Sequence, residues 1–120
     1  MKQIKLINAY SITEELSKDD KLSMQAKWVL YKLRKDLLPH YEFYIQESRT
    51  LFNKYETKNE GDYITFKSPK LAAEYQKAQK EIDNLEVEFN NKQTLKLSDI
   101  PNITVQQIEF LDDFIEFLPE

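Results

Sequence analysis

Residues 23–55 read SMQAKWVLYKLRKDLLPHYEFYIQESRTLFNKY, and this stretch carries a long helical pattern. Apolar or small residues recur at intervals of three and four from Ala26 to Tyr55, which keeps them on one helix face for about eight turns. Ser23 precedes the first turn, where its hydroxyl can accept a hydrogen bond from a free backbone N–H group. The stretch therefore predicts one amphipathic helix about 45–50 Å long.

Pro39 lies in the middle of this predicted helix. A proline removes one backbone hydrogen bond, and its ring collides with the preceding turn. We therefore expect a kink or a break near Pro39. Because the helical pattern resumes in phase after the proline, the sequence favours a kink.

A second helix is predicted to pack against the first. Ser68 and Pro69 form a typical helix start, since proline at the first helical position loses no hydrogen bond. Between the two helices, residues 57–62 are predicted to form a turn and residues 63–66 a short strand. The second helix repeats the same spacing of four and three, so we expect an antiparallel helical hairpin. Its apolar positions are Leu71, Tyr75, Ala78, Ile82 and Leu85.

Three segments suggest a small β-sheet. Residues 85–89 and 94–97 alternate apolar and polar side chains, and a three-residue loop over 91–93 would align them as an antiparallel pair. Residues 3–7 predict a further strand. A capping box over Ser11–Glu14 then predicts a short helix that starts near residue 12.

The last segment of the chain is predicted to be a helix over residues 105–117. Thr104 and Gln107 form a second capping box at its start. Apolar residues cover most of its circumference, so one apolar face is left for a further layer or a partner. The predicted fold is a single α+β domain over residues 1–120, with a long antiparallel helical hairpin, a small mainly antiparallel sheet and a C-terminal acidic amphipathic helix.

The composition limits the function classes. The chain has 120 residues, which suits one domain, and it contains no cysteine, so disulfides and thiolate metal sites are excluded. Residues 1–58 carry eleven basic and eight acidic residues, whereas residues 59–120 carry six basic and thirteen acidic residues. This acidic second half disfavours binding to nucleic-acid phosphates. The N-terminal residues lack the apolar core of a signal peptide, and no apolar run is long enough to span a bilayer.

Signals for catalysis are weak. A single glycine rules out the glycine-rich loops that bind nucleotide phosphates, and there is no G-x-S-x-G motif. His40 is the sole histidine, so no site with several histidine ligands can form. Asp112, Asp113 and Glu116 could in principle hold a cation, but a solvated acidic helix face explains them more simply. We expect a protein without catalytic activity, cofactor or metal.

Aromatic residues suggest a binding surface instead. Lys27, Lys32, Arg34 and Lys35 are interleaved with Trp28 and Tyr31, an arrangement compatible with nucleic-acid binding, although a solvated helix face is the favoured explanation. Tyrosine and tryptophan are also common anchors of protein interfaces. The predicted partner-binding anchors are Trp28, Tyr31, Phe110, Phe114 and Phe117. The predicted charged rim, which would select a basic protein partner, consists of Asp112, Asp113 and Glu116.

Several segments together resemble one family. They are Ile4-Lys5-Leu6-Ile7-Asn8-Ala9-Tyr10, the central helical pair, Thr94-Leu95-Lys96-Leu97-Ser98-Asp99, and Ile103-Thr104 followed by Leu111 and Phe114-Ile115. The pattern is similar to small uncharacterised proteins from tailed phages and prophages of low-GC Gram-positive bacteria. The resemblance implies a phage or prophage accessory protein of the host cytoplasm. The surplus apolar helix surface and the absence of catalytic motifs lead us to expect a non-enzymatic protein that binds another protein, and with this origin it would be a virion-assembly adaptor or an inhibitor of a host or defence protein. The alternatives are a homo-oligomeric structural component and, less favoured, a nucleic-acid-binding protein.

Overall fold

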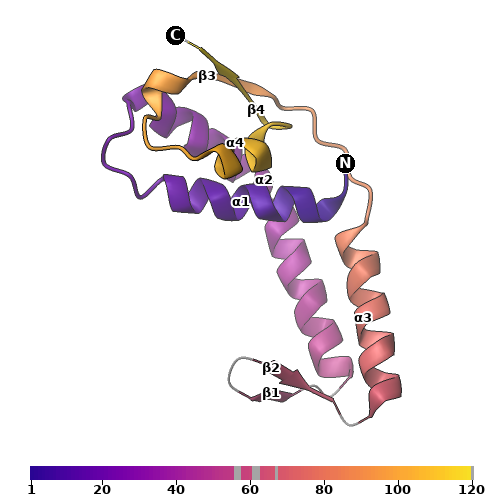
Figure 1. Cartoon of the computed structure of the whole chain (residues 1–120). Coiled ribbons are helices and arrows are strands. Elements are labelled where there is room, and N and C mark those ends of the chain that lie inside the picture. Colours follow the sequence, from indigo (N-terminus) through magenta and orange to yellow (C-terminus); the bar gives the residue numbers. More distant parts are fainter. Residues whose placement is uncertain (56–57, 61–62, 67, 120) are drawn as a thin grey trace.

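The computed structural model describes residues 1–55, 58–60, 63–66 and 68–119, and it shows an elongated molecule (Figure 1). Its principal dimensions are 55 × 31 × 21 Å, and its Cα radius of gyration is 17.2 Å. A compact domain of this length has a radius of gyration of about 14 Å. The elongation arises because a helical pair extends away from the rest of the chain. We call residues 38–84 the arm and the remaining residues the head.

The hydrophobic core lies in the head. Helix α1 (Gln3–Leu16) packs against the first half of α2 (Met24–Lys54) and against the short helix α4 (Val105–Leu111). None of residues 38–55, 66 and 68–94 is buried to the same extent as the core. The largest apolar side chains enclosed in the core are Leu6, Leu30, Leu33, Leu37, Leu95, Ile100, Leu111, Phe114 and Ile115.

Helix α1 is continuous from Gln3 to Leu16, so the predicted strand over residues 3–7 and the predicted helix start near residue 12 are both wrong. Its buried positions recur at helical spacing, but two of them, Gln3 and Thr13, are polar. Their side chains donate hydrogen bonds of 3.1 and 2.6 Å to backbone carbonyls, which permits their burial. These polar residues hid the helical period in the sequence. The buried residues are Gln3, Leu6, Ile7, Ala9, Tyr10, Thr13 and Leu16.

Helix α2 runs unbroken from Met24 to Lys54, through Pro39. The predicted cap at Ser23 is confirmed, because its hydroxyl accepts a hydrogen bond of 3.1 Å from the backbone N–H of Ala26. Pro39 lies on an exposed side of the helix. The backbone carbonyl that loses its partner, that of Lys35, can therefore bond to water, and the helix continues.

The arm is an antiparallel pair made by the second half of α2 and by α3 (Pro69–Asp83), as predicted. Tyr44, near the start of the arm in α2, meets Asp83 at the end of α3. The predicted start of α3 is confirmed, since the Ser68 hydroxyl accepts a hydrogen bond from the backbone N–H of Leu71. No residue of α3 is fully buried. The arm thus has apolar side chains but no core of its own.

A β-hairpin lies at the far end of the arm (Figure 1). Strands β1 (Lys58–Glu60) and β2 (Tyr63–Thr65) pair antiparallel, with Asn59 opposite Ile64. The predicted strand over residues 63–66 is confirmed at β2, whereas the predicted turn over 57–62 is wrong at residues 58–60. The remaining turn residues lie outside the described residues.

The sheet in the head is parallel, so the predicted antiparallel sheet is wrong. Strands β3 (Gln93–Lys96) and β4 (Ile115–Leu118) pair in parallel register, with Leu95 opposite Phe117. The predicted strand over residues 85–89 is absent; the backbone there forms one isolated bridge between Lys2 and Glu86. The single-turn helix η1 (Leu97–Asp99) and then α4 connect the two strands. Such a crossover is what a parallel pair requires.

The predicted C-terminal helix over residues 105–117 is also wrong in its second half. The capping box of Thr104 and Gln107 is confirmed, but α4 ends at Leu111. A turn follows, in which the backbone N–H of Phe114 donates to the carbonyl of Leu111 (2.9 Å). The chain then enters β4, so the last apolar residues belong to a strand.

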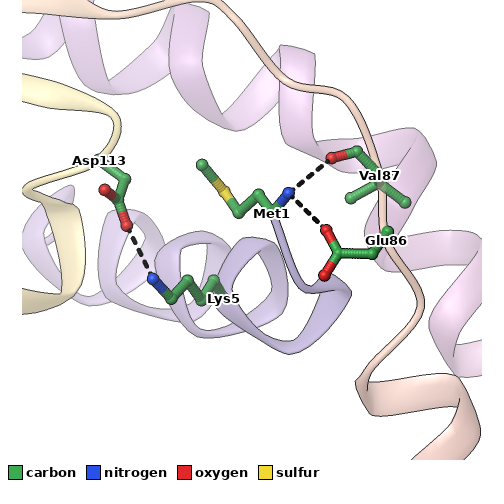
Figure 2. A network of polar contacts seen from close by, with 5 residues as sticks. All are labelled: Met1, Lys5, Glu86, Val87 and Asp113. Carbon is green, nitrogen blue, oxygen red and sulfur yellow. Dashed lines mark hydrogen bonds and ion pairs between the residues drawn. The ribbon is translucent and has the colours of Figure 1, made fainter.

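The first residues of the chain join the head to the end of α3 (Figure 2). The amino group of Met1 lies 2.9 Å from the Glu86 carboxylate and donates to the carbonyl of Val87 at 3.2 Å. The hydrogen bond and charge of the Met1 amino group lower the pKa of Glu86. Figure 2 also shows Lys5 of α1 paired with Asp113, which follows α4, at 3.3 Å. Both contacts lie at the N-terminal end of α1, which they join to the segment after α3 and to the turn after α4.

Candidate partner-binding face

The side of α2 that faces away from the core carries four large apolar side chains. Met24, Trp28, Tyr31 and Leu38 are spaced by four, three and seven residues, so they lie on one helix face. Trp28 is 57% exposed and Tyr31 is 48% exposed. We call these four residues, together with Lys27, Arg34 and Lys35, the α2 outer face. It extends for about 21 Å at 1.5 Å per residue.

The two aromatic rings at the centre of this face lie against each other. The ring centroids of Trp28 and Tyr31 are 5.9 Å apart, with an angle of 32° between the ring planes. Each ring covers part of its neighbour but leaves about half of its own side chain in solvent. Exposed tryptophan and tyrosine offer large, rigid contact areas at low entropic cost.

Two hollows lie on either side of Tyr31. One has a volume of about 170 Å³ and is lined by Leu22, Lys27, Tyr31, Arg34 and the hydroxyl-bearing Ser17. The other has a volume of about 260 Å³ and is lined by Tyr10, Tyr31, Arg34, Lys35 and Leu38. Both hollows share the phenol ring and the guanidinium group. Each can therefore receive an apolar side chain next to a positive charge.

The floor of the larger hollow is fixed by a stacked pair of rings. The ring of Tyr10 lies 4.2 Å from that of Tyr41, with an interplanar angle of 19°. Burial of Tyr10, followed by its hydrogen bond and charge interaction with Glu14, raises the pKa of its phenol. The floor of this hollow is thus uncharged at neutral pH, and the positive charge comes from Arg34 and Lys35.

The local charge of the α2 outer face is positive. Lys27, Arg34 and Lys35 lie within nine residues. Asp36, which directly follows that stretch, accepts a hydrogen bond of 3.2 Å from Asn91 of the segment before β3. Although the whole chain has a formal charge of −4, this face attracts carboxylates.

The predicted anchors do not form one surface. Trp28 and Tyr31 lie on α2, whereas the other predicted residues lie on α4, β4 and the turn between them. Phe114 is 0% exposed and its ring packs 5.4 Å from that of Phe89. A side chain enclosed in this way cannot anchor a partner. Phe117 is half-buried against the core from β4.

The predicted charged rim is exposed, but it lies far from the aromatic pair in the sequence and on different elements. Asp112, Asp113 and Glu116 are exposed, and Phe110 beside them is 39% exposed. Asp113 is already paired with Lys5. These residues form an acidic surface on the α4–β4 turn, and they leave the basic α2 outer face without an acidic rim of its own.

Two apolar members of the α2 outer face were not among the anchors predicted from the sequence. Met24 and Leu38 lie in phase with Trp28 and Tyr31, on the side of the helix opposite the core stripe. This second apolar line could have been found by its four–three spacing. The contributions of Tyr10 and Leu22 to the hollows could not, because they depend on how α1 and the following loop pack against α2.

No protein-family model, curated protein or solved structure significantly matches the chain. Among the described residues, no group of three or more acidic or histidine side chains is arranged to hold a metal ion. Within the same part of the chain, no helix has both the length and the hydrophobicity needed to cross a bilayer. The function therefore has to be inferred from the surface itself.

Proposed function

We propose that this protein is a non-enzymatic binding protein that captures an acidic protein segment on the α2 outer face. The observation that carries the proposal is the half-exposed pair Trp28 and Tyr31, of which Tyr31 lines two hollows that also share Arg34. Such a centre, with aromatic rings beside an arginine, has the composition of an interface hot spot.

The shape of the face favours a helical partner. The apolar line from Met24 to Leu38 is straight and extends for about four helical turns. An amphipathic helix can lay its apolar stripe along such a line and insert single side chains into the hollows beside Tyr31. Acidic residues at the flanks of that stripe would meet Lys27, Arg34 and Lys35. The expected partner segment is thus an acidic amphipathic helix of about 14 residues.

A single-stranded nucleic acid is the alternative, because bases stack on aromatic rings beside cations. One feature argues for the protein partner. Met24 and Leu38 place apolar side chains at both ends of the face, where a nucleic-acid backbone has no counterpart.

The resemblance to phage and prophage proteins predicts the setting of this interaction. The partner would be a virion component, if the protein is an assembly adaptor, or a host or defence protein, if it is an inhibitor. No match bears on this origin, so it stays a prediction.

The experiment compares surface variants as bait. Immobilised wild-type protein and the variants Trp28→Ala, Tyr31→Ala and Arg34→Glu are incubated with extract of the source cells. Val105→Ala is the control, because Val105 is also an exposed apolar residue but lies on α4. The partner is the protein retained by wild type and Val105→Ala and lost with the other three variants.

Binding of the purified partner is then measured by calorimetry at two salt concentrations. Loss of either aromatic ring should weaken binding about 30-fold, the effect of a typical hot spot. The effect of Arg34→Glu should become smaller at high salt, since it acts through charge. If Trp28→Ala and Tyr31→Ala bind as well as the control, the proposal is wrong. Tight, salt-dependent binding of a single-stranded oligonucleotide in place of a protein would overturn it in favour of the alternative.

A further inference from the structure

A second surface, on the arm, is independent of the α2 outer face. A groove of about 360 Å³ runs between the second half of α2 and α3. At the end of the groove nearest the head, Phe43 is 45% exposed and Leu85 is 43% exposed. Neighbouring turns contribute further apolar side chains, so the groove is an open apolar channel. Its apolar lining consists of Phe43, Leu51, Ala78, Ile82 and Leu85.

The contact between the two helices of the arm is polar near the head, whereas at the far end the rings of Tyr55 and Tyr75 meet edge-on at 6.1 Å. The Tyr44 hydroxyl donates to the Asp83 carboxylate at 2.8 Å. The side-chain amide of Gln79 donates to the same carboxylate at 3.1 Å, to the Tyr44 oxygen at 3.2 Å and to the Ser48 hydroxyl at 3.4 Å. A free-standing helical pair would bury its apolar residues at the contact and expose its polar ones. Near the head this arrangement is partly inverted, and the apolar side chains of Phe43 and Leu85 are left exposed beside the polar contact.

We propose that the groove is covered by the arm of a second copy, in an antiparallel two-fold dimer whose four helices form a short bundle. The covering element must present a stripe of mixed apolar and charged residues about as long as α3. The arm itself presents such a stripe. A two-fold contact of the same surface with itself needs no further partner, and it is the commonest form of protein association.

The charges of the groove set the direction of the two arms. Glu47, Thr50 and Lys54 line its α2 side, at spacings of three and four. If the two-fold axis passes beside Thr50, the carboxylate of Glu47 in each copy faces the ammonium group of Lys54 in the other. A parallel arrangement would place α2 beside α3 of the second copy, where Glu81 lies at the level of Glu47 and would repel it. The charges therefore select the antiparallel dimer.

The size of the groove face sets the strength of the dimer. Helix α3 has 15 residues, so the face is about 22 Å long, and two adjacent helices make it about 20 Å wide. The two copies together would bury on the order of 1,000 Å², near the lower limit of specific interfaces. We therefore expect a dimer with a dissociation constant in the micromolar range, which is monomeric when dilute.

Sedimentation velocity from about 1 to 500 μM tests the dimer. Wild type should change from monomer to dimer over this range. Glu47→Lys and Lys54→Glu should each weaken the dimer about tenfold, because each variant replaces two attractive pairs by two repulsive ones. The double variant Glu47→Lys/Lys54→Glu should restore wild-type affinity. Circular dichroism checks that the helices are intact in every variant.

Cross-linking gives a second readout, because the chain has no cysteine. Thr50→Cys lies beside the proposed axis and should form a disulfide-linked dimer on mild oxidation. Gln76→Cys, on an exposed part of α3 that does not line the groove, is the control and should not. A protein that remains monomeric at 500 μM would overturn the proposal, as would a dimer that the single variants leave unchanged. A double variant as weak as the single variants would exclude the antiparallel register. Trp28→Ala should not affect the dimer, so failure of this proposal is distinct from failure of the proposed function.

Discussion

Alanine substitution of Phe114 should destabilise the protein far more than the same substitution of Phe110. Phe114 is 0% exposed, packs edge-on against the ring of Phe89 and precedes β4, and its carbonyl accepts a hydrogen bond from the backbone N–H of Gln93. Removal of a fully buried phenylalanine costs about 3–5 kcal/mol, since both the burial and the surrounding contacts are lost. Phe110 is 39% exposed, and truncation of such a side chain costs below about 1 kcal/mol.

Urea unfolding followed by far-ultraviolet circular dichroism measures this difference. With a denaturant slope of about 2 kcal/mol per M, Phe114→Ala should lower the unfolding midpoint by about 1.5–2.5 M. Phe110→Ala should lower it by less than about 0.5 M. If residues 105–117 were one helix, as the sequence predicts, both phenylalanines would lie on one stripe and respond alike. Equal midpoints for the two variants would therefore contradict the turn and strand after α4 and the enclosure of Phe114.

Two further predictions concern the arm. Burial, and then the hydrogen bond and charge of Asp83, raise the pKa of Tyr44 from 10.0 to about 12. The protonated phenol therefore contributes its full stabilisation of the fold below pH 10, and this stabilisation is lost as the pH rises through about 12. Tyr44→Phe should lower the free energy of unfolding by about 1 kcal/mol at pH 8, a figure reduced for partial exposure. The same variant should remove one late-titrating phenol from the absorbance titration at 295 nm. An unchanged titration curve would contradict the hydrogen bond. Ser68→Ala removes the cap of α3 and should lower the free energy of unfolding by about 1 kcal/mol. In hydrogen exchange, amide protection should then fall in α3 and not in α1. Equal loss of protection in both helices would mean that arm and head unfold together.

The helices of the arm could be predicted because their signals are local. The spacing of three and four in α2 and α3 and the caps at Ser23 and Ser68 each involve residues within one or two turns. The capping box at Thr104 is local in the same way, and it was correctly placed. Short-range hydrogen bonds and periodicity thus set where these helices begin.

The sheet could not be predicted because its partners are distant in the chain. Residues 85–89 and 94–97 alternate as a hairpin should, but Gln3 and Met1 take the backbone groups of residues 85 and 87. The edge of β3 is then filled by β4, about 20 residues further on. The segment Phe114-Ile115-Glu116-Phe117-Leu118 supports either a helical or an alternating pattern. Leu95 is buried in the core, and this tertiary packing favours a strand over the local helical preference.

The candidate site was predicted in part, for the same reason. Trp28 and Tyr31 could be identified by residue type, because a large aromatic residue outside the core stripe of a helix must be exposed unless another element covers it. Phe114 could not be separated from Phe110 by type or by helical position, since the end of α4 between them depends on β3. The hollows beside Tyr31 depend on α1, which the sequence did not reveal as a helix.

The division into head and arm leaves large apolar side chains exposed on two separate surfaces. A chain of this length can bury about two thirds of its unfolded surface when it is compact, but the long helix α2 carries its second half beyond the head. Leu37 is its last fully buried residue; Tyr41 still stacks on Tyr10 of α1, and beyond that point α3 is the helix that packs against it. The α2 outer face lies on the half of this helix that is anchored in the core, so it is rigid and suited to recognition. The groove lies on the half that is not, where a second copy would add the missing packing and stabilise the arm as it associates.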